Sequence, residues 1–554
     1  MLDKIKNQIP LLLLLLLSAL SFVVLLKPGY FPMHDDQQAI RLLEMDKCIK
    51  DGQIPCRWVP DLGYGYGYPQ FNYYGPLPYY VMEVFHLAGL GFLDSVKAGF
   101  IISVIFSAIG MYLLGKALWG KWGGFLSGFI YAFIPYRAVD MYVRGAVGEF
   151  WAMSLLPFVF LFILEIFKGK KKAIVGLGIS IAFLITSHNI TTFIFVPVAA
   201  LWVLFLVYKD FGSLKQVLLK TEDLLLGIFL GFLLSAYFLL PVILEEKFAH
   251  IETLTMGYFN YLAHFVSLNQ LLFSNFWAYG TSEIGPYDNI SFAVGILVWV
   301  LPLLFLVLAA LLKKKETKTI LFFVLTGWLA LFFTHAKSSF IWKIVPTLSY
   351  IQFPWRFLIL AVFCFSVAIG SLTIFFEKNP KLIIYPLSAI VIITILFNSA
   401  FFKPSNWFYI SDSEKFSGKS WNKQITSSIF DYLPIYAKYP PAAAAPDKLE
   451  IISGKAKIID GQKGTNWQRW KIEATTDSEI RLSLFDYPGW KVFVDNKNVS
   501  INHNNELGLI TFSVPSGDHE IYVKLTRTPI RTIGEILSII GIAGTLIFVV
   551  KFRK

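Results

Sequence analysis

Residues 9–26 read IPLLLLLLLSALSFVVLL, a run of 18 residues without a charge. A helix of about this length crosses a hydrocarbon layer about 30 Å thick. Similar runs recur as far as residues 533–550, and 56% of all residues are hydrophobic while only 16% are charged. One water-soluble core cannot bury so much apolar surface, so the sequence predicts a polytopic α-helical membrane protein.

The apolar runs predict about twelve membrane-spanning helices. The stretch 77–93 is apolar too, but it is short and carries Glu83 and His86, which are costly at the centre of a bilayer. We therefore predict an interfacial or re-entrant helix there. The first run follows Lys4 and Lys6 and lacks a small-x-small cleavage site, so it is predicted to be an uncleaved anchor rather than a signal peptide. The spans are predicted near residues 9–26, 98–117, 122–138, 150–168, 173–187, 191–208, 223–244, 292–312, 319–334, 355–376, 382–402 and 531–550.

Lysine-rich loops predict the orientation of the chain. The formal net charge of +12 would suggest a nucleic-acid partner in a soluble protein, but here the lysines gather in short loops such as 168–172 and 313–318. Such clusters mark cytoplasmic loops, so we expect no nucleic-acid partner and predict a multi-pass plasma-membrane protein with both termini cytoplasmic. The extracytoplasmic segments are then residues 27–97, 139–149, 245–291, 335–354 and 403–530.

The region near the C-terminus has a different pattern. Apolar side chains alternate at Ile480, Leu482 and Leu484, and again over 510–514 and 521–525, as in half-buried strands. Turn residues separate these stretches, so we predict a small antiparallel β-sandwich. The predicted domains are a multi-span region 1–402 with a first external loop 27–97, an extracytoplasmic linker 403–446, the β-sandwich 447–528 and a final membrane helix 531–550.

Three cysteines occur, two of them close together in the first external loop. An oxidising exterior favours a disulfide between Cys48 and Cys56, and two unpaired thiols are the alternative. Cys364 lies inside a predicted span and is interpreted as core packing.

The most informative polar residues directly follow the first span. His34, Asp35 and Asp36 place an imidazole and two carboxylates just outside the hydrocarbon layer, where a membrane-bound substrate would react. One carboxylate could be a general base toward an acceptor hydroxyl, or the pair could hold a divalent metal that neutralises a phosphate leaving group. A structural role fits equally well, because an aspartate before segment 37–50 would cap a helix.

Further charged residues are predicted at the same membrane face. Arg137 or Arg144 could bind a lipid phosphate while Glu149 orients an acceptor or a metal. The alternative is that these residues form ion pairs with one another and extend to the lipid headgroups. His188 lies in a polar turn between two spans, where a hydrogen-bonded turn residue is commoner than a catalyst. Arg356 begins a span at the outer face, where it could meet a phosphate or snorkel to headgroups.

Tyrosines alternate with glycines over residues 63–68. The rings of Tyr66 and Tyr68 offer flat faces for stacking on a sugar, although tyrosine is also typical of any membrane interface. The sandwich is tethered between two predicted spans, so it is expected to stay near this face and to recognise an acceptor or cover a cavity.

Several motifs together resemble a known superfamily. The Leu-rich first helix, the acidic pair and the segment Pro76-Leu77-Pro78-Tyr79-Tyr80 look like the GT-C superfamily of membrane glycosyltransferases. The closer resemblance is to bacterial membrane proteins named for a "6-pyruvoyl-tetrahydropterin synthase-related domain" and to their YfhO-type relatives. The sequence has no visible His-rich zinc cluster of the kind a soluble pterin synthase uses, so that name adds no mechanism here. The matching residues are His34-Asp35-Asp36, Ile54-Pro55-Cys56-Arg57-Trp58, Gly65-Tyr66-Gly67-Tyr68-Pro69, Tyr74-Gly75-Pro76-Leu77-Pro78-Tyr79-Tyr80 and Tyr487-Pro488-Gly489-Trp490-Lys491-Val492.

The resemblance implies a GT-C-like arrangement of residues 1–402 and transfer of a sugar from a polyprenyl-phosphate carrier. The acceptor would be an envelope glycan, lipid or protein, membrane lipids would be further partners, and the acting carboxylate would be Asp35 or Asp36. Because the pattern is Asp-Asp rather than Asp-x-Asp, a Mg²⁺ or Mn²⁺ cofactor stays open.

Two alternatives to the enzyme are a lipid-linked saccharide transporter or flippase and a non-catalytic envelope assembly factor. The enzyme is favoured because acidic residues gather at one face, whereas a transporter should carry ionisable or helix-breaking residues at mid-membrane depth.

Overall fold

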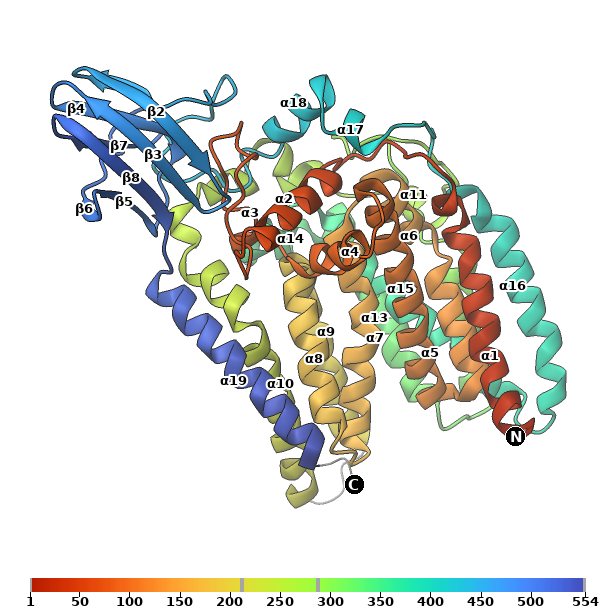
Figure 1. The fold of residues 1–554 in the computed structure, drawn as a ribbon. Helices are drawn as coiled ribbons and strands as arrows, with labels where there is room; N and C mark the ends of the chain where they lie inside the picture. Colours follow the sequence, from red (N-terminus) through yellow and green to blue (C-terminus); the bar gives the residue numbers. More distant parts are fainter. Residues whose placement is uncertain (1, 210–213, 285–288, 552–554) are drawn as a thin grey trace.

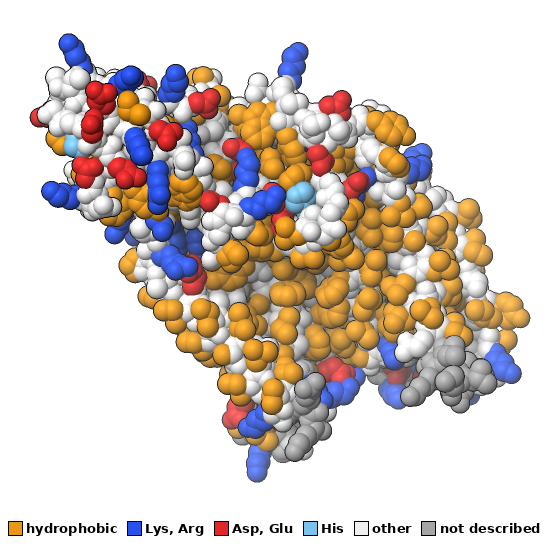
Figure 2. Space-filling model, viewed as in Figure 1, with side chains coloured by type: hydrophobic (Ala, Val, Ile, Leu, Met, Phe, Trp, Pro, Cys, Tyr) orange, Lys and Arg blue, Asp and Glu red, His pale blue; other side chains and the backbone are white. Residues whose placement is uncertain are grey.

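The computed structural model describes residues 2–209, 214–284 and 289–551. Figure 1 shows a bundle of long helices, a layer of short helices and loops over one end of it, and a β-domain beside that layer. Helix α1 begins and helix α19 ends at the opposite end of the bundle. Figure 2 shows a broad band of hydrophobic side chains over the helices, with charged side chains gathered above and below it. This distribution is that of a protein embedded in a bilayer.

Each predicted span has a helix in the described part of the chain. Eight helices have the length and composition to cross a membrane, and shorter apolar helices cover Gln8–Ser21, Ala173–Ser187 and Ile296–Leu311. One of the eight, α5, provides two spans, so the fold-class prediction of about twelve membrane helices is confirmed. The helices are α1 (Leu2–Ser18), α5 (Phe92–Ala132), α7 (Val147–Phe167), α8 (Ala173–Ser187), α9 (Asn189–Lys209), α10 (Leu214–Leu244), α12 (Ile296–Leu311), α13 (Thr317–Thr334), α15 (Leu358–Ile369), α16 (Ile384–Asn398) and α19 (Pro529–Lys551). Short 3-10 turns extend α1 to Leu26, and others flank α15 and α16.

Helix α5 reverses direction at Gly120, whose φ of 79° and ψ of 177° are not helical. A side chain has difficulty adopting this backbone, whereas glycine adopts it readily. The two arms pack closely, because a Cβ added at Gly115 would lie only 2.9 Å from the Cα of Gly124. The sequence therefore specifies a tight helical hairpin where spans 98–117 and 122–138 were predicted.

The second arm of this hairpin ends earlier than predicted, at Ala132 rather than residue 138. Pro135 disfavours a helical conformation at the preceding residue, and Ile134 is extended. The chain continues as α6 (Pro135–Val139) and a π-helical turn (Asp140–Arg144) before α7 begins. This irregular segment brings polar side chains to the end of the bundle, where they form part of the site described below.

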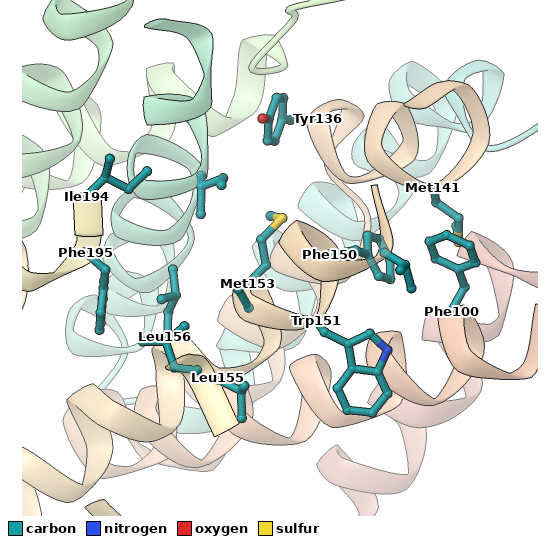
Figure 3. Close-up of a cluster of buried hydrophobic side chains, with 14 of the residues drawn as sticks. Phe100, Tyr136, Met141, Phe150, Trp151, Met153, Leu155, Leu156, Ile194 and Phe195 are labelled. Atoms are coloured by element: carbon teal, nitrogen blue, oxygen red, sulfur yellow. The ribbon is translucent and has the colours of Figure 1, made fainter. Parts of the chain in front are cut away.

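The core of the bundle is made of aromatic and branched side chains. Figure 3 shows part of it, with side chains of α7 lying near those of α5 and α9. The ring centroids of Phe100 and Phe150 are 5.3 Å apart, and those of Phe160 and Phe195 are 5.5 Å apart. Such close packing holds α7 in one position, and α7 carries Glu149 at its first turn.

The layer over the end of the bundle consists of short helices. Helix α4 has 11 residues and is therefore roughly 16 Å long, which is too short to cross a bilayer. The segment 403–446, predicted to be a linker, carries two helices of this layer and contributes to the cavity described below. The helices of the layer are α2 (Gln38–Lys50), α3 (Gln70–Tyr73), α4 (Leu77–Leu87), α11 (Leu268–Leu272), α14 (Ser339–Ile344), α17 (Asp412–Lys415) and α18 (Gly418–Thr426).

The β-domain is a sandwich of two antiparallel sheets, with strand orders β1-β4-β7 and β2-β3-β8-β5-β6. The predicted alternation is present, since Ile480, Leu482 and Leu484 are buried. The Phe485 amide donates to the Tyr66 carbonyl at 3.0 Å, which fixes the sandwich to the first external loop. The strands are β1 (Glu450–Ser453), β2 (Ala456–Lys463), β3 (Trp467–Ala474), β4 (Ser478–Phe485), β5 (Trp490–Val494), β6 (Lys497–Val499), β7 (Leu509–Val514) and β8 (Gly517–Leu525).

A buried ion pair joins four distant parts of the chain. The Glu245 carboxylate, at the base of the sandwich, accepts from Arg531 of α19 at 2.9 Å and from Asn72 of the first loop at 3.1 Å. Tyr487 of the sandwich shares a hydrogen bond of 2.7 Å with Tyr73. Removing one member of a buried pair is strongly destabilising. This junction therefore holds α10, α19, the first loop and the sandwich together.

Cys48 and Cys56, eight residues apart and both buried, are joined by a disulfide. A cross-link that closes a short loop stabilises mainly by restricting the unfolded chain. We expect the Cys48→Ala/Cys56→Ala variant to lose about 2–3 kcal/mol of unfolding free energy in denaturant titrations. The control is wild-type protein under reducing conditions, which should approach the same value as the disulfide opens. Equal stability of the oxidised wild type and the double variant would contradict this prediction.

Candidate active site

A cavity of about 460 Å³ lies where the layer of short helices meets the end of the bundle. Its walls come from the first external loop, the irregular segment before α7, the turn between α8 and α9, the loop after α10, the segment before α15 and the segment 403–446. The cavity brings together six of the predicted site residues, which are His34, Asp35, Arg144, Glu149, His188 and Arg356.

Backbone hydrogen bonds fix Asp35 at the wall of this cavity. The amides of His34 and Asp35 donate to the carbonyls of Val143 at 2.8 Å and of Arg144 at 2.9 Å. The Asp35 carboxylate accepts from Arg41 and from the Gln38 amide, each at 3.3 Å, and one third of its side chain stays exposed. Asp35 is therefore a held but accessible carboxylate.

Asp36 is placed differently from its neighbour. Its carboxylate pairs with the buried ammonium of Lys415 at 2.6 Å, and Asp36 does not line the main cavity. Neither aspartate caps helix α2, because the N-cap residue is Gln37 and no side-chain cap bond is formed. Of the two predicted carboxylates, Asp35 is the one that can contact a molecule in the main cavity.

A buried carboxylate organises the cations of the cavity. Glu149 is 1% exposed, and Arg144 holds it in a bidentate pair with distances of 2.8 and 2.9 Å. Arg356 approaches the same carboxylate at 3.5 Å, and the Tyr136 hydroxyl donates to it at 2.6 Å. Arg144 also pairs with Asp140. The ion pairing predicted as the alternative reading of these residues is therefore present, and it presents two guanidinium groups at one wall.

Burial lowers the pKa of both histidines of the cavity. Burial lowers the pKa of His188 to about 3, with the nearby Arg356 acting in the same direction. Its Nδ1 lies 2.8 Å from the Thr191 hydroxyl. Burial also lowers the pKa of His34, although Asp35 opposes this shift. Both imidazoles therefore stay unprotonated over a wider pH range, and burial weakens them as proton acceptors.

Three predicted residues lie away from the cavity. Arg137 is fully buried within the bundle, donates to the Ser107 hydroxyl at 2.9 Å and packs on the Phe150 ring. Tyr66 packs against the sandwich, and the Tyr68 hydroxyl donates to the Ser428 carbonyl at 2.9 Å. These three side chains pack between segments of the protein, and none of them lines the cavity.

Sequence reasoning missed several residues of the wall. Arg41 contacts Asp35, and Gln352 accepts from Arg356 at 2.9 Å. The ring centroid of Tyr74 lies 4.3 Å from the guanidinium carbon of Arg41. Asp431 lines the cavity from a segment far along the chain. Tyr74 belongs to a motif that had been recognised, whereas Asp431 has no local signal, because only the fold brings residue 431 to residue 35.

A family described as "6-pyruvoyl-tetrahydropterin synthase related domain; membrane protein" matches residues 71–403. The chain belongs to this family. The resemblance predicted from the motifs is thereby confirmed, and the chain is a membrane protein. Arg144, Glu149, His188 and Arg356 lie within the matched residues, while Asp35 lies outside them.

This member of the 6-pyruvoyl-tetrahydropterin synthase related family has a curated relative in Lactococcus lactis subsp. cremoris (strain MG1363), an uncharacterized protein. The two are 26% identical over 296 residues, which cover 50% of this chain and 45% of the relative. The match thus spans less than half the length of that relative, so it assigns no activity to this chain.

Solved glycosyltransferase structures are similar to parts of this family member. The Archaeoglobus fulgidus oligosaccharyltransferase with Zn and sulfate is 12% identical, with 72% of this chain and 53% of that chain covered and a TM-score of 0.40. The same organism's AglB with an inhibitory peptide and a dolichol-phosphate is 12% identical, with coverages of 73% and 57% and a TM-score of 0.44. The mycobacterial arabinofuranosyltransferase AftD is 14% identical, with coverages of 73% and 27% and a TM-score of 0.46. These TM-scores are below 0.5, so the function proposed below rests on this chain's own residues.

The cavity does not suit a resident divalent metal. Among the described residues, no group of three or more His, Cys, Asp or Glu side chains is placed to hold a metal ion. Asp35 is contacted by the Arg41 guanidinium and the Gln38 amide, and Glu149 by Arg144 and Arg356. These donors occupy one oxygen of Asp35 and both oxygens of Glu149, which leaves few carboxylate oxygens for Mg²⁺ or Mn²⁺. The family name adds no pterin mechanism either, since no zinc-type cluster occurs in this part of the chain.

Proposed function

We propose that this protein is a membrane glycosyltransferase that moves a sugar from a polyprenyl-phosphate carrier to an acceptor hydroxyl at the outer face of the plasma membrane. The observation that carries the proposal is the placement of Asp35 on the wall of one cavity with Arg144 and Arg356. A transfer of this kind needs a base for the acceptor and cations for the phosphate leaving group. The acceptor would belong to an envelope glycan, a lipid or a protein.

The orientation follows from the position of the lysine-rich loops. Residues 168–172 connect α7 to α8 at the end of the bundle opposite the sandwich. Because short lysine-rich loops stay in the cytoplasm, both termini are proposed to be cytoplasmic and the cavity to face outward. The disulfide between Cys48 and Cys56 supports an external location of the first loop.

The proposed reaction uses three residues in two roles. Asp35 takes the proton of the acceptor hydroxyl, whose oxygen bonds to C1 of the donor sugar. The bond from C1 to the carrier phosphate breaks, and polyprenyl phosphate leaves with the bonding electrons. Arg144 and Arg356 stabilise that phosphate, because each guanidinium has five N–H donors and can contact Glu149 and a phosphate together. Since donors hold one oxygen of Asp35 and both oxygens of Glu149, we propose that no divalent metal takes part.

The cavity also offers apolar surface next to these charges. Val242 of α10, Ile251, Leu254 and Phe353 line it together with the polar residues. A lipid-linked donor needs such a wall for the isoprene units nearest the phosphate. This combination of apolar wall, cations and carboxylate supports a lipid-linked donor rather than a soluble sugar nucleotide.

The test is turnover by purified protein in lipid discs with a panel of labelled polyprenyl-phosphate sugars, with and without a chelator. Sugar release or transfer that persists in the chelator is the expected result. If no donor reacts although the protein is folded and envelope acceptors are present, the proposal fails. Carrier-linked sugar that crosses a vesicle membrane without reaction would then indicate a transporter or flippase. If neither transfer nor transport is detected, the remaining alternative is a non-catalytic assembly factor.

A pH dependence is expected from Asp431, which lines the same cavity. Burial raises the pKa of Asp431 to about 6, so its charge appears as the pH rises through that value. The added negative charge repels an anionic donor, and we expect the donor KM to rise on the order of fivefold between pH 5 and pH 7. The donor phosphodiester keeps one negative charge over this range, so it adds no titration of its own. The rise should be absent in Asp431→Asn, and an equal rise in both proteins would contradict the assignment.

A further inference from the structure

A second pocket, of about 90 Å³, lies beside the main cavity. Its walls come from the start of the first external loop and from α17, α18 and the residues that follow α18. His34, Asp35 and Ser428 line both spaces. Asp35 therefore stands between two cavities, and a proton acceptor in that position can serve a molecule in one while the other holds its reaction partner.

Two buried oxygens of the residues around this pocket lack a donor. Gln424 is 2% exposed, and its amide nitrogen donates to the carbonyls of Lys415 at 2.8 Å and Ser420 at 3.1 Å. These bonds fix the amide, and within the described structure its Oε1 has no partner. Asp36 accepts from Lys415 through one carboxylate oxygen, and the other is buried without a partner. Leaving a buried acceptor without a donor is unfavourable, so the pocket favours a ligand that brings hydroxyl groups.

The pocket also carries a cation without a direct ion pair. Lys415 is paired with Asp36, whereas Lys423 is exposed, acts on Asp36 only at longer range and has no carboxylate within salt-bridge distance among the described residues. The hydroxyls of Ser420 and Ser427 lie in the same lining. An ammonium beside hydroxyl groups suits an anion such as a phosphate.

We propose that this pocket binds the acceptor, and that the acceptor is a hydroxyl-bearing unit with a phosphate close to the reacting hydroxyl. The proposal rests on the function proposed above and specifies its second substrate. The hydroxyl reaches Asp35 from the small pocket, while the donor sugar lies in the main cavity. Asp35 removes the hydroxyl proton, the oxygen bonds to C1 of the sugar, and the carrier phosphate departs. The same glycerol-phosphate type of chemistry occurs in a membrane headgroup and in a water-soluble or polymeric phosphate.

The first experiment measures binding alone, so it does not depend on turnover. The full chain is placed in phosphatidylcholine discs, and three probes are titrated, namely sn-glycerol 3-phosphate, glycerol and inorganic phosphate. Glycerol 3-phosphate should bind about tenfold more tightly than either fragment. Lys423→Ala should weaken that binding about tenfold. Lys419→Ala is the matched control, because Lys419 is exposed on the same helix but does not line the pocket, and its binding should equal that of the wild type.

The outcomes separate this inference from the proposed function. Equal binding by wild type and Lys423→Ala, or inorganic phosphate binding as tightly as glycerol 3-phosphate, would overturn the acceptor pocket even if sugar transfer occurs. If binding follows the expected order while no donor reacts, the proposed glycosyltransferase function is wrong although the pocket binds its ligand. Discs containing phosphatidylglycerol identify the source of the ligand. Competition by these discs supports a lipid acceptor, and its absence supports a soluble or polymeric one.

With an active preparation, the kinetic counterpart is the acceptor KM. Lys423→Ala should raise it about tenfold, whereas Lys419→Ala should not change it. Gln424→Met keeps the length of the side chain and removes the unpartnered oxygen together with the amide bonds to the Lys415 and Ser420 carbonyls. It should raise the KM for a hydroxylated phosphate as well, and a thermal titration of the variant checks that the fold is kept. An unchanged acceptor KM in both pocket variants would overturn the inference.

Discussion

Replacing Asp35 by asparagine is expected to lower sugar transfer by about a thousandfold. The amide has nearly the same shape as the carboxylate but cannot accept the proton of the acceptor hydroxyl, and burial lowers the pKa of both histidines that could replace it. The measurement is initial turnover in lipid discs with the donor that the wild type uses. Folding should be retained, because the backbone bonds of Asp35 to the segment before α7 do not involve its side chain.

The neighbouring aspartate provides the comparison for this prediction. Asp36→Asn weakens the partner of Lys415, which is only 4% exposed, and should lower the unfolding free energy by about 1–3 kcal/mol while leaving measurable transfer. Asp35→Asn weakens the partner of Arg41, which is 2% exposed, so it should lose stability to a similar extent. The two variants are therefore distinguished by transfer, which only Asp35→Asn should lose. If Asp35→Asn turns over as fast as the wild type, Asp35 is not the base.

Glu149→Ala is expected to lower the unfolding free energy by about 3–5 kcal/mol. The carboxylate is buried and holds both Arg144 and Arg356, so its removal leaves two buried cations without their shared partner. The measurement is a denaturant or thermal titration in detergent. Glu149→Gln keeps the volume but replaces one acceptor oxygen by an N–H donor that faces guanidinium groups. The difference between Glu149→Ala and Glu149→Gln therefore measures packing, and the loss that remains in Glu149→Gln measures the charge and its hydrogen bonds.

A double variant tests whether the loss of stability in Glu149→Ala comes from unpaired charge. In Glu149→Ala/Arg356→Ala one of the two cations is gone, and Arg144 still has Asp140 as a partner. We therefore expect part of the lost stability to return. A double variant that is as unstable as the sum of the two single changes would mean that packing, rather than charge, explains the loss.

The membrane helices were predictable because hydrophobic length is a local property of the chain. The hairpin of α5 follows from two apolar runs with glycine between them, and the shortness of 77–93 already argued against a span. The end of that hairpin at Ala132 was missed because apolar character continues past it, while the backbone changes at Ile134 and Pro135. The segment 403–446 was read as a linker since its two short helices have no long apolar run.

Residues of the candidate site could be predicted where they belong to one short sequence motif. They could not be predicted where segments far apart in the sequence meet. His34, Asp35, Arg144 and Glu149 stand out as charged residues beside apolar runs, and they do share one cavity. The sequence left Asp35 and Asp36 equivalent, and only the position of Lys415, far along the chain, distinguishes them. Tyr66 and Tyr68 were read as sugar-stacking rings because their exposure was unknown, and the docked sandwich and segment 403–446 bury them.

The junction around Glu245 has a consequence for biosynthesis. Arg57 of the first external loop contacts Glu535 of α19 at 3.2 Å, and Asn72 and Arg531 meet at the Glu245 carboxylate. Because a ribosome delivers the chain from its N-terminus, the first loop reaches the outer face long before α19 is made. The Arg57 guanidinium of this loop therefore lacks its Glu535 partner while the intervening helices insert. The junction that fixes the sandwich and the first loop is complete only after α19 has been made and inserted.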